Sequence, residues 1–186
     1  MDLTKLKNSI PEHEKDLKLN VATVLSVEGA PGLAEHQILG VALASAVAAR
    51  NPTLLREIEA LVVPKLDAPQ VAAARAAATI MGMNNVYYRF VHLAENPDYA
   101  RLPAKLRMNV IGNPGVAKVD FELYSLAVSA INGCGACIAA HDKVVRGAGV
   151  TAEGVQSAVR IAAVLHGVAV ALESTAPQTG TMRDAA

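Results

Sequence analysis

The feature that most limits the fold of this chain is its richness in alanine combined with a near absence of aromatic residues. Hydrophobic residues make up 52% of the 186 positions, aromatic residues only 3%, and there is no tryptophan. Alanine has the highest helix propensity, whereas strands favour aromatic and β-branched residues. The length is sufficient for one well-buried domain. The composition therefore predicts an all-α fold.

Turn and capping residues divide the chain into expected helices. Asn51-Pro52 and Asn113-Pro-Gly115 mark boundaries, and Asp67 and Thr151 are suitable N-caps. A polar loop is expected over residues 95–103 and a flexible tail over 176–186. The expected helical segments are approximately 2–9, 18–25, 33–50, 52–63, 68–90, 120–131, 134–147 and 152–173.

Weak similarity between the two halves of the chain suggests an internal repeat. Leu19-Asn-Val21 recurs as Met108-Asn-Val110. We expect a single domain over residues 1–175, built from two copies of one helical unit at about 18–92 and 107–173. Each copy would bury its apolar face against the other.

Charge and apolar patterns argue against several classes of function. The formal net charge is zero and no basic stripe is visible, so nucleic-acid binding has little electrostatic support. The N-terminal twenty residues are charged and contain no signal-peptide core, and no apolar run approaches a membrane span. We therefore expect a cytoplasmic protein without a membrane partner. In that reducing compartment a C-x-x-C motif is more often catalytic or metal-binding than a structural disulfide.

The only two cysteines form such a motif, Cys134-Gly-Ala-Cys137, and His141 follows one helical turn later. On a helix these three side chains share one face, and the spacing of the cysteines permits a disulfide. The preceding Asn132-Gly133 should place both cysteines in the first turn of a helix. There the free backbone N–H groups and the helix dipole stabilise a thiolate.

Glu122, on the preceding expected helix, could orient His141, which in turn could take or relay a proton. Each of these residues also has an ordinary structural explanation when taken alone. Cysteine, histidine and carboxylate are in addition acceptable zinc ligands, although no second cysteine pair is present. The residues alone therefore leave a redox dithiol, a zinc site in a binding module, and an inert motif open. In the repeat alignment, the positions equivalent to Cys134, Cys137 and His141 are Arg50, Thr53 and Glu57.

The long central segment 68–90 carries further polar and bulky residues. Two amides inside it, Asn84 and Asn85, need hydrogen-bond partners if buried and could bridge helices or subunits. In a later helix we expect His166 to be a satisfied buried histidine. Four large side chains of the central segment are interpreted as core or subunit contacts rather than as a substrate pocket: Met81, Met83, Tyr87 and Tyr88.

Residues 121–141 resemble the AhpD-type alkylhydroperoxidases of the carboxymuconolactone decarboxylase-like superfamily. The shared pattern is a glutamate, a C-x-x-C motif twelve residues later, and a histidine four residues beyond its second cysteine. Residues 80–89 (IMGMNNVYYR) and 107–115 (RMNVIGNPG) extend the resemblance. It implies an all-α fold of two related halves, assembled as a homotrimer. It also implies an antioxidant enzyme that reduces alkyl hydroperoxides.

The resemblance further implies partners and residue roles. Electrons would come from dihydrolipoamide on a lipoylated acyltransferase, with lipoamide dehydrogenase and NADH upstream, and would pass to an oxidised AhpC-type peroxiredoxin. No tightly bound cofactor is expected. Cys137 matches the cysteine that forms the sulfenic acid or mixed disulfide, and Cys134 matches its resolving partner, so the two would form a disulfide. Glu122 and His141 match the proton-relay residues.

One position departs from the family pattern. Many members have a histidine directly before the second cysteine, where this chain has Ala136. We therefore expect a less acidified thiol pair and weaker direct peroxidase activity. A decarboxylase of the same superfamily, acting on a lactone acid, is an alternative, but its chemistry would not need a C-x-x-C motif.

Overall fold

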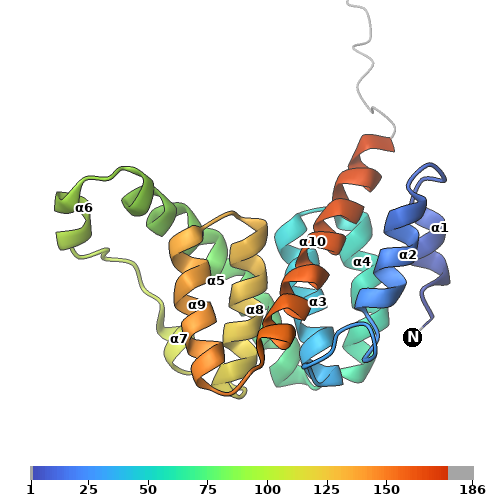
Figure 1. Cartoon of the computed structure of the whole chain (residues 1–186), viewed down its shortest axis with the longest axis horizontal. Helices are drawn as coiled ribbons and strands as arrows, with labels where there is room; N and C mark the ends of the chain where they lie inside the picture. Colours follow the sequence, from blue (N-terminus) through green and yellow to red (C-terminus); the bar gives the residue numbers. More distant parts are fainter. Residues whose placement is uncertain (1, 176–186) are drawn as a thin grey trace, which may run out of the picture.

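The computed structural model describes residues 2–175, and every regular element in that range is a helix (Figure 1). The all-α prediction is therefore confirmed. In chain order the elements are α1 (Thr4–Ser9), α2 (Lys15–Val24), α3 (Glu35–Ala49), α4 (Pro52–Val62), the 3₁₀ turn η1 (Val63–Lys65), α5 (Ala68–Leu93), α6 (Pro97–Arg101), α7 (Asn109–Gly112), α8 (Lys118–Ile131), α9 (Gly135–Gly147) and α10 (Ala152–Thr175).

Capping residues set the helix boundaries largely as the sequence predicts. Asp67 forms a capping box with Gln70 at the start of α5, which continues to Leu93, three residues beyond the expected end. The prediction of a loop throughout 95–103 is wrong, because the short helix α6 lies within it. Asn96 accepts a hydrogen bond from the backbone of Asp98, and Pro97 fits the first helical position.

Helix α3 lies at the centre of the molecule, packed against α4, α5, α8 and α10. Ten of its fifteen residues are buried, which explains why it is apolar around most of its circumference. Small residues make close packing possible. A Cβ atom on Gly40 would lie 2.3 Å from the ring of Tyr124 on α8, so only glycine fits at this crossing. The buried core of α3 and α8 fixes the helix that carries Glu122.

Helix α10 corrects one expectation about apolar segments. It is the single helix within residues 2–175 whose length and composition would allow it to cross a membrane. It packs against α2, α3 and α8 and is half buried in its most apolar window. Its apolar character is therefore accounted for by its place in the helical core.

The helices recur in the same order in the two halves. α8 begins 83 residues after α3, α9 begins 83 residues after α4, and α10 begins 84 residues after α5. Asn51 is the N-cap of α4 and Cys134 is the N-cap of α9. The helix starts thus pair Cys134 with Asn51, one residue away from the Arg50 position expected from the sequence alignment.

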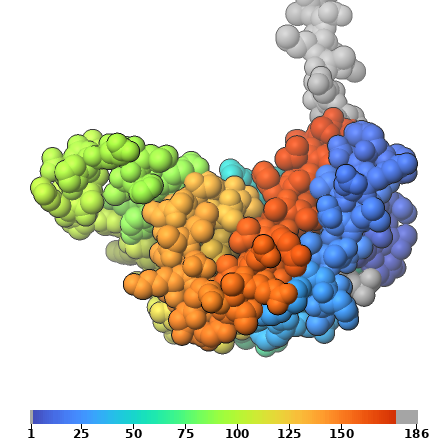
Figure 2. Space-filling model, viewed as in Figure 1, coloured from blue at the N-terminus to red at the C-terminus, as the bar shows by residue number. Residues whose placement is uncertain are grey.

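The segment around α6 projects from the body of the molecule (Figures 1 and 2). It continues the exposed end of α5 and returns to the body through α7. Its exposed hydrophobic side chains include Phe90, Leu93, Tyr99 and Leu102. The predicted tail, 176–186, lies outside the described residues.

Candidate active site

The two cysteines lie at the start of α9, the placement that the Asn132-Gly133 break predicts. Gly133 has a φ of 68°, in the left-handed region that favours glycine, and it turns the chain from α8 into α9. Cys134 is the N-cap, and its sulfur accepts a hydrogen bond from the backbone N–H of Cys137 at 3.3 Å. The Cα atoms are 5.3 Å apart, and the sulfurs lie at disulfide-bonding distance.

The two sulfurs differ in access to solvent and ligands. Cys134 is fully buried, whereas Cys137 is 6% exposed and lines a cavity of about 290 Å³. The cavity walls come mainly from apolar side chains of α5, α7 and α9, with Ala136 beside Cys137. A molecule entering this cavity therefore meets the sulfur of Cys137, with Cys134 behind it.

His141 and Glu122 meet at the same site. Nδ1 of His141 lies 2.7 Å from Oε2 of Glu122, and both side chains are largely buried. Glu122 occupies the second turn of α8, since this helix begins at Lys118, so a simple first-turn dipole effect does not explain it. The contact is the base-and-orienter geometry that the sequence suggested.

Met81 provides the second contact of the His141 ring. Its Sδ atom lies 3.2 Å from Nε2, on the side opposite Glu122. A thioether is only a weak acceptor, so it favours a proton on Nε2 without holding it strongly. In its protonated form His141 donates through both nitrogens, and the Nε2 proton is the easier of the two to release to a stronger acceptor.

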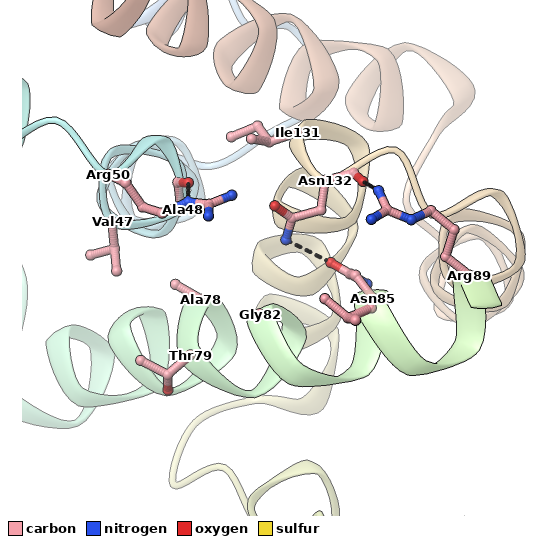
Figure 3. Close-up of a pocket in the computed structure, with 11 residues that line it drawn as sticks. Val47, Ala48, Arg50, Ala78, Thr79, Gly82, Asn85, Arg89, Ile131 and Asn132 are labelled. Carbon is pink, nitrogen blue, oxygen red and sulfur yellow. Dashed lines mark hydrogen bonds between the residues drawn. The ribbon is translucent and has the colours of Figure 1, made fainter.

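A polar network behind the cysteines connects α5 to the turn before Cys134 (Figure 3). Asn85 donates to Oγ of Ser129 at 2.9 Å and accepts from the side chain of Asn132 at 2.9 Å. Arg89 donates to the backbone oxygen of Asn132 at 2.6 Å. The expectation that the two amides bridge helices is confirmed for Asn85 but not for Asn84, whose Oδ1 has no partner among the described residues. The network fixes the turn that positions Cys134.

This network borders a second, larger cavity of about 590 Å³. Figure 3 shows the side chains of Arg50 and Arg89 reaching toward Asn132 from opposite sides. The residues that line this cavity include neither cysteine. The residues that line this cavity therefore support the α8–α9 turn and are not part of the dithiol site.

Two sequence interpretations need correction. Met81 is a core residue, as predicted, but Met81 and Tyr88 also line the cavity of Cys137, so the interpretation of these side chains as core contacts alone is incomplete. Helical periodicity shows that a residue faces inward but does not show whether neighbouring helices close over it. His166 is exposed, not buried, because it lies on the outer face of α10.

The zinc alternative finds no supporting geometry. Within residues 2–175, no group of three or more His, Cys, Asp or Glu side chains is arranged to hold a metal ion. The four candidate residues instead form two pairs, Cys134 with Cys137 and Glu122 with His141. The sequence could not show this division, because it depends on how α8, α9 and α5 pack.

Comparison with known proteins identifies the family of the chain. A family model described as the carboxymuconolactone decarboxylase family matches residues 97–177. Three similar proteins are named alkyl hydroperoxide reductase AhpD. The one from Brucella anthropi is 54% identical over 174 residues, covering 94% of this chain and 98% of the relative. Those from Rhodospirillum centenum and a Methylobacterium species are 53% and 56% identical, covering 97% and 94% of this chain and 95% and 97% of the relatives. The chain belongs to the AhpD family.

Proposed function

We propose that this protein is an antioxidant thiol oxidoreductase that reduces alkyl hydroperoxides with the dithiol of Cys134 and Cys137. The observation that carries the proposal is the position of Cys137. It is the accessible sulfur of the pair and faces an apolar cavity that also contains His141. An apolar cavity with few polar groups is suited to an alkyl chain that carries one reactive group.

The chemistry follows from the positions of the sulfurs and the imidazole. The Cys137 thiolate attacks the terminal oxygen of the hydroperoxide, the O–O bond breaks, and the alcohol leaves with a proton from His141. Cys137 is then a sulfenic acid. The Cys134 thiol attacks it, forming the disulfide and releasing water. Glu122 orients His141 and stabilises its charge during the transfer.

Reduction of the disulfide requires a two-electron dithiol donor, for which we propose dihydrolipoamide. One of its thiolates attacks the accessible sulfur of Cys137, and Cys134 leaves as a thiolate. The backbone N–H of Cys137 already points at the Cys134 sulfur at 3.3 Å, so the leaving thiolate is stabilised where it forms. The second donor thiol then releases the mixed disulfide as oxidised lipoamide.

The proposed physiological setting follows the family. The donor would be carried by a lipoylated acyltransferase and recharged by lipoamide dehydrogenase and NADH, and the reduced dithiol would also regenerate an oxidised AhpC-type peroxiredoxin. We propose a cytoplasmic homotrimer for this role. The mostly exposed segment around α6 gives such an assembly hydrophobic surface to bury.

A coupled assay tests the proposal. NADH oxidation is followed with lipoamide, lipoamide dehydrogenase and cumene hydroperoxide, with and without an AhpC-type peroxiredoxin, for the native chain and Cys137→Ser. We expect turnover with the native chain and none above background with the variant. Equal rates would contradict the proposal. One zinc ion per chain in the purified protein would instead favour the metal-stabilised binding module.

A further inference from the structure

Asn84 differs from every other polar residue of the cavity walls. It lies on α5, one turn after Met81, and is only 4% exposed. Its Oδ1 atom is buried and has no hydrogen-bond partner among the described residues. Three other buried side-chain oxygens within residues 2–175 share this lack of a partner, those of Ser45, Tyr124 and Ser125, but only Asn84 lines one of the described cavities.

The neighbouring amide shows what a structural asparagine looks like in the same helix. Asn85 is fully buried and uses both ends of its amide, donating to Ser129 and accepting from Asn132. An unpartnered buried amide is unfavourable, and buried polar groups in folded proteins are nearly always hydrogen-bonded. A leucine at position 84 would suit the apolar walls of the cavity better. The Asn84 amide therefore destabilises the folded protein unless a ligand forms the missing hydrogen bond.

We propose that Asn84 binds the hydroperoxide itself and positions it for attack. The unpartnered atom is an acceptor, so its ligand must supply a donor, and the terminal O–H of a hydroperoxide is one. That same oxygen is the one that Cys137 attacks. When its O–H donates to Asn84, the terminal oxygen of the hydroperoxide remains within the cavity that Cys137 lines. The other peroxide oxygen, which leaves as the alkoxide, can then take the proton of His141.

The remaining walls fit the rest of such a molecule. Met108 and Ile111 of the α7 region face the cavity and offer apolar contact to the alkyl group. Asn84 would also accept a hydrogen bond from the O–H of the sulfenic acid on Cys137 before Cys134 resolves it. This assignment rests on the proposed peroxidase function and adds to it a residue that recognises the peroxide group.

The assignment separates the two half-reactions, because reduction of the disulfide by a dithiol needs no peroxide-binding acceptor. The test uses Asn84→Leu, with Asn84→Ala as a smaller second variant. The first readout is oxidation of the reduced protein by cumene hydroperoxide, followed as loss of free thiols. The second is reduction of the disulfide by dihydrolipoamide, and the third is the melting temperature.

We expect both variants to be oxidised by the hydroperoxide at least about tenfold more slowly, the loss of one well-placed hydrogen bond. Reduction by dihydrolipoamide should stay within about twofold of native. The melting temperature of Asn84→Leu should be equal to or above that of the native chain, because a partnerless amide is removed. The matched control, Asn85→Leu, should instead lower the melting temperature.

Two results would overturn the assignment while leaving the proposed function intact: unchanged oxidation by hydroperoxide in both variants, or equal slowing of both half-reactions. A native protein whose thiols do not react with hydroperoxide at all would instead contradict the proposed function, and the assignment with it. The three outcomes are therefore distinguishable in one set of measurements.

Discussion

Helices α4 and α9 begin in the same way but serve different ends. Oδ1 of Asn51 accepts the backbone N–H of Leu54 at 2.9 Å, and Sγ of Cys134 accepts that of Cys137 at 3.3 Å. In α4 the third residue, Leu54, is fully buried core, and the cap also donates to Glu173 on α10. In α9 the third residue is Cys137, which faces a cavity. The two halves therefore use the same kind of helix start for different purposes. With the Asn51 oxygen as the cap it supports packing, and with the Cys134 sulfur as the cap it positions the dithiol.

The largest effect is expected when the second half is given the N-cap residue of the first half. Cys134→Asn should keep α9 capped, because asparagine is a preferred N-cap. It removes the resolving thiol, so steady-state turnover in the lipoamide-coupled assay should fall by roughly three orders of magnitude or more. Circular dichroism should show native helix content. Turnover comparable to the native protein would mean that the disulfide is not part of the cycle.

The proton-relay pair gives the next largest effect. His141→Gln should lower turnover about 10²–10⁴-fold, the usual contribution of a positioned acid or base. The chain offers a matched control in His36, whose Nε2 lies 3.3 Å from Oδ2 of Asp120 on the same helix that carries Glu122. His36→Gln should leave turnover unchanged. Equal losses of turnover in both variants would indicate that His141, like His36, acts through folding and not through proton transfer.

A smaller change is expected at Ala136, beside Cys137 in the cavity wall. Ala136→His places a positive charge and a proton acceptor near the thiols, which increases the thiolate fraction at neutral pH. We expect the reduced variant to be alkylated several-fold faster at pH 7, with the rate levelling off at lower pH than in the native protein.

Ala139→His is the control for this change, since Ala139 is exposed on the same helix and does not line the cavity. Its alkylation rate should match that of the native chain. If both histidine variants accelerate alkylation equally, general surface charge rather than position 136 sets the thiol reactivity.

The smallest effect on activity is expected in the first half. Asn51→Ala removes the cap of α4 and its contact with Glu173, which should lower the free energy of unfolding by about 1 kcal/mol. Chemical denaturation measures this loss. Turnover per folded molecule should not change at temperatures where the variant is fully folded, and a clear fall there would mean that the two halves are functionally coupled.

Much of this architecture can be predicted from local sequence signals. Prolines, capping residues and alanine-rich runs give most helix boundaries, because these act within one or two turns. The spacing of Cys137 and His141 likewise predicts a shared helix face, and both residues line the same cavity, whereas Cys134 is the N-cap and does not line it. The short helix α6 is not predicted, because the sequence Asn96-Pro97 is equally typical of a turn.

What the sequence cannot supply is the set of contacts made between helices. Met81 meets His141 across 60 positions, and Glu122 meets it from another helix. The difference between Asn84 and Asn85 is also invisible in the chain, since adjacent amides on one helix point toward different neighbours. Access to the sulfurs follows from the same packing, with Cys134 enclosed and Cys137 open to the cavity.

We infer that disulfide exchange with a partner takes place at Cys137, while Cys134 stays behind it. Trapping the mixed disulfide tests which of the two sulfurs exchanges. Reduced Cys134→Ser and Cys137→Ser are each incubated with oxidised glutathione, a disulfide that has no tethered second thiol to release the adduct, and adducts are located by peptide mass spectrometry. We expect a stable glutathione adduct on Cys137 in Cys134→Ser and little or none on Cys134 in Cys137→Ser. An adduct formed as fast on Cys134 as on Cys137 would contradict this inference.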